Sequence, residues 1–233
     1  MTELGNAFTA ALGLILGADR DLVEIVGLSL RVSLTAVGLA ALVGLPLGAA
    51  LALYPFKGRG AVIVGLNTLM GLPPVVVGLV VYLALSRSGP LGVLGLLFTP
   101  TAMIVAQWIL VTPIVAALGR QMIADLWAEY SEQLGSLGAN RARAIPTLLW
   151  DGRIGLMTGV LAGFGRASAE VGAVMIVGGN IDHATRVMTT AIALETSKGD
   201  LAAALALGIV LLGLSLAVNG AASALGATTR PAA

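Results

Sequence analysis

The chain has 233 residues and a formal net charge of +1 at pH 7, and 58% of its residues are hydrophobic while 11% are charged. Ordinary soluble domains carry roughly 25% charged residues, so this composition excludes a soluble domain and predicts a protein built for lipid. The sequence has no cysteine and one histidine, which excludes disulfides and argues against a metal site with several convergent ligands. It has no basic cluster with interleaved aromatic residues, so we expect no nucleic-acid partner.

The first apolar stretch, residues 7–18, is too short to cross a bilayer as a helix. It ends at Asp19, Arg20 and Asp21, and no basic region precedes it, as a cleaved signal sequence requires. We expect a helix that lies at the membrane interface. A sixth crossing in this stretch would change only the location of the amino terminus.

Five longer apolar stretches follow, each at or near the ~20 residues that cross a bilayer as a helix. They are continuous and do not alternate in polarity along the chain, which disfavours membrane strands. We therefore predict an all-α polytopic membrane protein of about five transmembrane helices, folded as a single transmembrane domain over residues 1–233. The stretches are residues 32–53, 61–86, 88–119, 154–181 and 201–229.

Pro73 and Pro74 stand inside the second stretch, where the loss of backbone hydrogen bonds kinks or breaks a helix. Broken helices often line substrate pathways, because freed backbone groups need a cavity or a protein neighbour. A simple packing kink is the alternative. The sequence leaves both interpretations open.

Arg166 and Glu170 are the two charges within the fourth stretch. They are four residues apart and are therefore predicted on one helix face. A charge in lipid costs about 2.5–3.5 kcal/mol on insertion scales, and such side chains usually face the protein interior. The two residues either lie near a translocation pathway or form a structural pair that locks neighbouring helices, and the second use is the commoner. After this stretch, residues 185–190 could hydrogen-bond an entering anion or cap a surface helix.

Lys and Arg near the membrane ends predict the orientation, because cytoplasmic loops carry an excess of both. With five crossings, the richer side includes the polar loop at about residues 120–153, which places that loop in the cytoplasm and the amino terminus outside. The richer side has Lys57, Arg59, Arg120, Arg141, Arg143, Arg153 and Arg230, and the other side has Arg20, Arg87, Arg186 and Lys198.

The polar loop begins with an amphipathic pattern. Apolar residues recur at steps of four and three, which is typical of a helix with one apolar face, and Gly138 then tolerates the positive φ of a helix stop. We predict a helix, a tight turn and a second short helix. Periodicity alone leaves open whether the apolar face packs on the protein's own membrane helices or meets a partner. The face consists of Ile123, Trp127, Tyr130, Leu134 and Leu137.

The order Glu132, then Leu137-Gly138-Ala139, then Arg141, followed by a membrane helix, resembles the cytoplasmic coupling motif of ATP-binding-cassette (ABC) importer permeases. In that family the segment forms short helices that sit in a groove of the ATPase subunit. Further stretches resemble the oxyanion group of these permeases, and the tungstate-type permeases in particular. They are residues 72–78, 88–92, 163–173 and 178–181 for the group, and 97–103, 136–141, 185–192 and 194–200 for the tungstate type.

The resemblance implies the membrane-spanning subunit of an ATP-driven oxyanion importer, with tungstate as the expected substrate and alternating access as the mechanism. Molybdate or sulfate as the substrate, or an ion-driven secondary transporter, are the alternatives. The sequence contains no Gly-x-x-x-x-Gly-Lys-Ser/Thr loop, so ATP-Mg is expected on a partner ATPase, with no cofactor and no catalytic residue on this chain. The implied partners are a second copy of the chain, two cytoplasmic ABC ATPase subunits, an extracytoplasmic oxyanion-binding protein and the lipid of a prokaryotic cytoplasmic (inner) membrane.

Two sets of residues are candidates for these functions. The first set would couple the chain to the ATPase. In it, Glu132 and Gln133 would face water or the ATPase rim. Leu134 and Leu137 would supply apolar contact, and Gly138 would make the turn. Arg141 would pair with acidic groups of the partner or anchor the loop on the cytoplasmic side. The ATPase-coupling set is Glu132, Gln133, Leu134, Leu137, Gly138, Ala139, Asn140 and Arg141, and the translocation set is Pro73, Pro74, Arg166 and Glu170.

Overall fold

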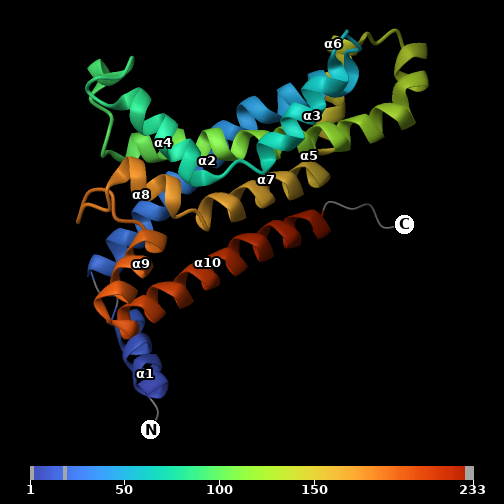
Figure 1. The fold of residues 1–233 in the computed structure, drawn as a ribbon. Helices are drawn as coiled ribbons and strands as arrows, with labels where there is room; N and C mark the ends of the chain where they lie inside the picture. Colours follow the sequence, from blue (N-terminus) through green and yellow to red (C-terminus); the bar gives the residue numbers. More distant parts are fainter. Residues whose placement is uncertain (1–2, 18–19, 229–233) are drawn as a thin grey trace. The chain divides into compact units, whose positions relative to one another are not determined.

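The computed structural model describes residues 3–17 and 20–228, and this part of the chain is helical, with turns and no strand (Figure 1). The prediction of an all-α polytopic membrane protein is confirmed. The helices are α1 (Glu3–Leu16), α2 (Arg20–Leu53), α3 (Arg59–Met70), α4 (Pro74–Leu85), the 3-10 helix η1 (Gly92–Leu94), α5 (Pro100–Ser136), α6 (Arg141–Asp151), α7 (Arg153–Ser168), α8 (Gly172–Gly178), α9 (Met188–Lys198) and α10 (Leu201–Thr228).

Three of these helices, α2, α5 and α10, are each long and apolar enough to cross a membrane. Two further pairs, α3 with α4 and α7 with α8, qualify only when each bent pair counts as one span, which gives up to five candidate spans among the described residues. The predicted number of about five agrees with this upper value. Helix α1 has 14 residues and is not among the candidates; its location at the membrane interface stays a prediction. Residues 18 and 229 of the predicted stretches, together with Asp19 and Arg230, lie outside the described residues.

The predicted helix break at Pro73 and Pro74 is confirmed. Helix α3 ends at Met70, and α4 begins at Pro74, a first helical position where the missing proline N–H is not needed.

The prediction of a helix over residues 88–119 is wrong at its beginning, because α5 starts only at Pro100. The preceding segment forms turns and η1, and two of its glycines lie directly on backbone oxygens. A Cβ atom at Gly89 would overlap the Leu83 oxygen, and one at Gly92 would overlap the Ser86 oxygen. Such close backbone approach requires glycine and is incompatible with a continuous helix here.

The chain forms two compact units that alternate along the sequence. The first unit comprises Met1–Leu34, Pro74–Gln107 and Ser168–Ala233, and the second comprises Thr35–Pro73 and Trp108–Ala167. The expectation of a single permease domain stays a prediction.

Within the first unit, α4 packs on α8, and α10 packs on both α1 and α9. Figure 1 shows α9 turning back into α10. The α4–α8 contact is tight, because a Cβ atom at Gly78 would stand 2.7 Å from the Ala173 Cα atom. Small residues allow membrane helices to approach closely and gain van der Waals contact, which replaces the hydrophobic driving force that is absent in lipid.

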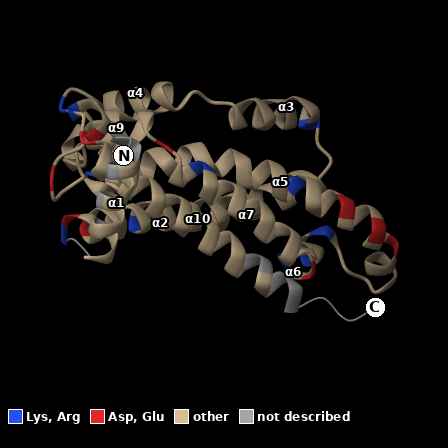
Figure 2. Cartoon of the chain, turned by 90° about the horizontal axis from the view of Figure 1, so that it is seen from below, with Lys and Arg blue, Asp and Glu red and all other residues tan. Residues whose placement is uncertain are grey.

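Within the second unit, the carboxy-terminal part of α2 packs on α5 through Gly44 and Gly48, whose missing side chains leave room for the backbone at Ala116. Toward the end of both helices, α6 folds against them. Figure 2 shows the charged residues of this unit concentrated toward α6 and the last turns of α5. The shared core consists of Ala49, Ala52, Leu53, Ile123, Ala144, Leu148 and Leu156.

Candidate coupling site

Helix α5 ends in a left-handed turn at Gly138, whose φ is +73°. The Gly138 N–H donates to the Gly135 oxygen at 3.0 Å, and the Ala139 N–H donates to the Leu134 oxygen at 2.9 Å. This pair of bonds is a Schellman motif, which satisfies carbonyl groups at the helix end. A left-handed backbone costs an L-residue roughly 1–2 kcal/mol, so glycine is favoured here. The predicted helix stop is confirmed.

The second helix, α6, is capped by Asn140. Its side-chain Oδ1 accepts a hydrogen bond from the Arg143 N–H at 2.9 Å, and its backbone oxygen accepts one from the Ala144 N–H at 3.0 Å. Asparagine is among the best N-cap residues for this reason. The predicted order of helix, turn and short helix is confirmed, with one difference: the first helix is the last part of the 37-residue α5 and not a separate short element.

The coupling candidates differ in burial. Leu134 is half-buried and packs on the core that Ile123 and Ala144 share. Leu137 lies at the turn with 81% of its surface exposed. The first part of the apolar face therefore packs on the protein's own helices, whereas its end remains available to a partner. The other exposed members of the set are Glu132, Gln133, Gly138, Asn140 and Arg141, and Ala139 is half-buried.

The polar face of α5 near the turn is acidic. Asp125, Glu129 and Glu132 are all exposed. A hydrogen bond to Glu129 and the negative charge of that residue raise the pKa of Tyr130 above its usual 10.0, with a smaller contribution from Asp151. The raised pKa reflects the negative charge on this face of α5.

A basic groove lies on another side of this segment. The Arg59 guanidinium donates from Nε to the Leu51 oxygen at 2.7 Å and from Nη2 to the Ala52 oxygen at 2.9 Å. A cation at this helix end is favourable, because the last carbonyl groups of α2 carry partial negative charge. Arg59, Arg141 and Trp127 line an open groove of about 310 Å³. The segment thus presents three features: an acidic ridge formed by Asp125, Glu129 and Glu132, the exposed Leu137, and the basic groove.

The four translocation candidates do not lie on one helix. Pro73 and Pro74 mark the α3–α4 break, and Arg166 lies in α7. Because α7 ends at Ser168, Glu170 lies in the break before α8. The prediction that Arg166 and Glu170 share one helix face is therefore wrong, since the α-helical geometry that it assumes stops between them.

Glu170 has a structural role that explains its burial. Its side chain is 3% exposed, and its Oε1 accepts a hydrogen bond from the Ala173 N–H at 3.0 Å at the start of α8. Its backbone oxygen accepts a bond from the Thr189 hydroxyl at 2.8 Å. A carboxylate is favourable at a helix amino terminus, where free N–H groups concentrate positive charge.

The hydroxyl groups of residues 185–190 are used by the backbone around them. The Thr185 hydroxyl donates to the Gly178 oxygen at 2.6 Å and accepts from the Ile181 N–H at 2.9 Å. The Thr190 hydroxyl accepts from the Val187 N–H at 3.1 Å. Both threonines are fully buried. These hydroxyl groups therefore bond to the ends of neighbouring backbone segments, as the capping interpretation of residues 185–190 expects.

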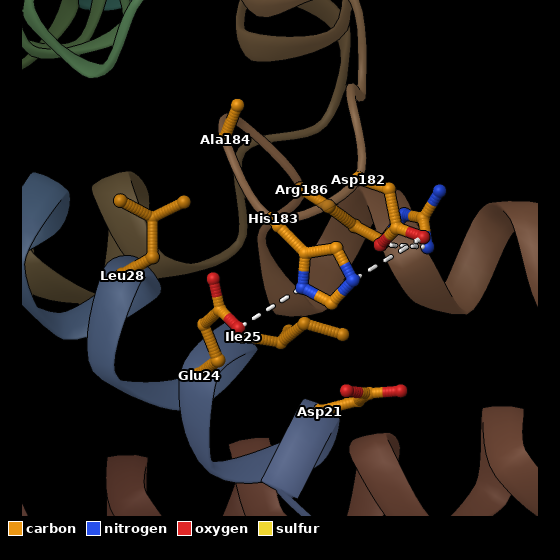
Figure 3. A pocket seen from close by; sticks show the side chains of 8 residues that line it. All are labelled: Asp21, Glu24, Ile25, Leu28, Asp182, His183, Ala184 and Arg186. Carbon is orange, nitrogen blue, oxygen red and sulfur yellow. Dashed lines mark hydrogen bonds and ion pairs between the residues drawn. The ribbon is translucent and has the colours of Figure 1, made fainter.

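A small cavity beside this loop is unsuited to a dianion. Figure 3 shows Asp21, Glu24 and Asp182 around it, together with His183 and Arg186. Its volume is about 40 Å³, enough for a few water molecules. Arg186 is already paired with Asp182 at 2.6 Å. Three carboxylates around so small a space would repel an oxyanion.

His183 joins this loop to α2. Its Nδ1 lies 3.0 Å from the Glu24 Oε2, and its Nε2 lies 3.9 Å from the Asp182 Oδ2 (Figure 3). The hydrogen bond to Glu24, followed by the negative charges of Asp182 and Glu24, raises the pKa of His183 above 6.5. A raised pKa in the folded state means that this contact stabilises the fold fully below pH ~6.5 and loses its effect as the pH rises through the folded-state pKa.

We expect Glu24→Gln to lower the pKa of His183, because it removes the charge that favours the imidazolium. His183 is the only histidine, so its ring signals in an NMR titration are unambiguous. Glu195→Gln is the matched control, since Glu195 pairs with Lys198 at 2.8 Å and does not contribute to the shift. An unchanged titration midpoint in Glu24→Gln would contradict the assignment.

Curated relatives match the chain over almost its whole length, although no family model matches it. The tungstate uptake system permease protein TupB of Peptoclostridium acidaminophilum is 42% identical over 219 residues, which cover 94% of this chain and 96% of the relative. A probable anion ABC transporter permease protein of Haloferax volcanii is 43% identical over 214 residues, 90% of each chain. TupB of Campylobacter jejuni is 38% identical over 214 residues, 92% of this chain and 90% of the relative. The chain therefore belongs to the anion ABC transporter permease family that includes the tungstate uptake system permeases.

Proposed function

We propose that the chain imports tungstate as the membrane-spanning subunit of an ATP-driven transporter that works by alternating access. The observation that carries this proposal is the similarity, over nearly the full length, to permeases named for tungstate uptake. The exposure of Leu137 on a turn that the Schellman motif holds in place supports a docking role for this turn.

The transporter would contain a second copy of the chain, two ABC ATPase subunits and an extracytoplasmic oxyanion-binding protein. One ATPase would dock on each copy at the turn after α5, with residues 120–153 in the cytoplasm of a prokaryotic cell and the helices in its cytoplasmic membrane. ATP-Mg would be bound by the ATPase, because this chain has no phosphate-binding loop. The acidic ridge and the basic groove provide charges of both signs for this contact, which would favour orientation and rate of association more than affinity.

The packing of the second unit supports a mechanical role for the turn. Ala144 and Leu148 of α6 are buried in one core with Ile123 of α5 and Leu53 of α2. Close-packed interiors transmit strain, so a force applied to α6 would move the ends of α2 and α5 together. Contact with a moving ATPase would thereby reach membrane helices directly.

The test is uptake by the reconstituted complex. The chain is co-expressed with its genomic neighbours, purified, incorporated into vesicles and supplied with tungstate, with and without ATP. We expect an ATPase to co-purify and tungstate to accumulate only with ATP. Preferential uptake of molybdate or sulfate would mean that this anion, and not tungstate, is the substrate. Uptake that stops when an ion gradient is collapsed in the presence of ATP would indicate a secondary transporter instead.

Gly138→Val is expected to weaken ATPase docking, because a β-branched side chain opposes the left-handed backbone at φ +73°. A penalty of about 1–2 kcal/mol corresponds to a roughly five- to thirtyfold loss of the correctly folded turn. Gly138→Asn should retain docking, since asparagine tolerates this conformation. The ATPase recovered in pull-down is the measurement.

Gly135→Val is the control for this experiment, because Gly135 lies in regular helix with no atom within 4 Å of a Cβ position. If Gly138→Val recovers as much ATPase as the parent chain, the turn does not have this role.

A further inference from the structure

An apolar groove lies between α2 and the α6–α7 corner, entirely within the second unit. Its volume is about 430 Å³, and apart from Arg153 its walls are apolar. Leu42 on one wall is 73% exposed. From Arg153 to Val160 the groove follows α7 for about 10 Å at the helical rise of 1.5 Å per residue. The lining residues are Ala41, Leu42, Leu45, Pro46, Leu149, Arg153, Leu156, Met157 and Val160.

Arg153 lines this groove and is held in place by Trp150. Its Nη1 donates to the Trp150 oxygen at 2.8 Å, and its guanidinium carbon lies 4.8 Å from the centre of the Trp150 ring. The Trp150 side chain is 72% exposed. Neither contact neutralises the arginine charge, and no ion pair found among the described residues includes Arg153. Arginine and tryptophan together are typical of the interface between lipid tails and water.

We propose that the groove binds an anionic phospholipid, with one acyl chain along α7 and the phosphate on Arg153. A single cation in the wall of an otherwise carbon-lined groove is complementary to a molecule with a charged head and an apolar tail. Basic pockets between membrane helices bind such headgroups.

A second copy of the chain is the competing occupant of an apolar face in a membrane protein. It would have to cover Arg153 and provide a carboxylate, because burying an unpaired charge costs several kcal/mol. A phospholipid provides the negative charge without any such requirement and is present around every membrane protein. The charge of the groove therefore favours lipid. The inference requires only the membrane location of the chain and not the proposed transport function.

The experiment uses the full chain with its co-purifying subunits, incorporated into vesicles of equal parts phosphatidylglycerol and phosphatidylcholine. After gentle detergent extraction, native mass spectrometry measures the phospholipid retained per chain. We expect the parent to retain phosphatidylglycerol in preference to phosphatidylcholine, and Arg153→Gln to retain about fivefold less of it, the factor for roughly 1 kcal/mol per basic residue at an anionic surface. Arg143→Gln, which removes an exposed arginine outside the groove, should retain as much as the parent.

Three results would overturn the proposal. The first is equal phosphatidylglycerol retention by the parent and Arg153→Gln, and the second is no preference between the two lipids in the parent. The third is efficient disulfide formation between two copies of a Leu42→Cys variant in membranes, which would place a second copy against the groove. The chain has no cysteine of its own, so this cross-link has no background.

Discussion

Gly48→Ala is expected to destabilise the protein by about 3 kcal/mol, the upper end of the usual range for overpacking. A Cβ atom at Gly48 would stand 2.5 Å from the Ala116 oxygen and 2.8 Å from the Arg120 nitrogen. Both are backbone atoms of α5, so they cannot move aside as the end of a flexible side chain would. The gain in helix propensity from glycine to alanine, about 1 kcal/mol, is too small to compensate.

Thermal unfolding in detergent, followed by the loss of the monodisperse peak in gel filtration, measures this effect. Gly38→Ala is the matched control, because Gly38 lies in the same helix and no atom is within 4 Å of its Cβ position. The control should be as stable as the parent or more stable. Equal unfolding temperatures for the two variants would contradict the close approach of α2 to α5.

Leu137→Asp is expected to reduce ATPase binding by a factor of ten or more while leaving the fold intact. The leucine is 81% exposed at the turn, so the permease alone loses little when it is replaced. Covering a leucine with a partner is worth about 1.5–3 kcal/mol, and placing a carboxylate in the same apolar contact adds a desolvation penalty. A loss of about 1.4 kcal/mol in binding free energy corresponds to a tenfold loss of affinity.

Two controls make this result specific. Val93→Asp introduces the same charge at another exposed apolar position, 96% exposed, outside the coupling segment, and should leave ATPase binding unchanged. Leu134→Asp should lower the unfolding temperature instead, because Leu134 packs on the core of the second unit. Normal pull-down of the ATPase by Leu137→Asp would remove the leucine from the interface.

The sequence predicted the presence and order of the apolar helices better than the residues at which they begin and end. A helix needs an apolar run of about twenty residues to cross a bilayer, so the number and order of candidate membrane helices follow directly from the apolar runs in the sequence. Hydropathy does not distinguish an apolar helix from an apolar turn, however. The late start of α5 depends on Gly89 and Gly92 lying against backbone oxygens, and the position of Glu170 depends on the break after α7. These are features of the folded backbone.

The candidate site shows the same division between local and tertiary information. The helix stop at Gly138 was predicted from the sequence, because a left-handed turn has a strong preference for glycine. The N-cap role of Asn140 was not predicted, although the preference of that position for asparagine is a local signal that could have identified it. Leu134 and Leu137 belong to one periodic face, and only the return of α6 determines that the first packs inward and the second stays exposed. The contact between His183 and Glu24 joins residues 159 apart in the chain and has no local signal.

Helix α5 has 37 residues, which corresponds to about 55 Å at 1.5 Å per residue. The hydrocarbon layer of a bilayer is only about 30 Å thick, so a helix of this length exceeds it by about 25 Å. A stalk of this length would project the docking turn beyond the lipid headgroups. In the proposed transporter, the helix that crosses the membrane would also carry the docking turn, so a push from the ATPase would act directly on a transmembrane segment.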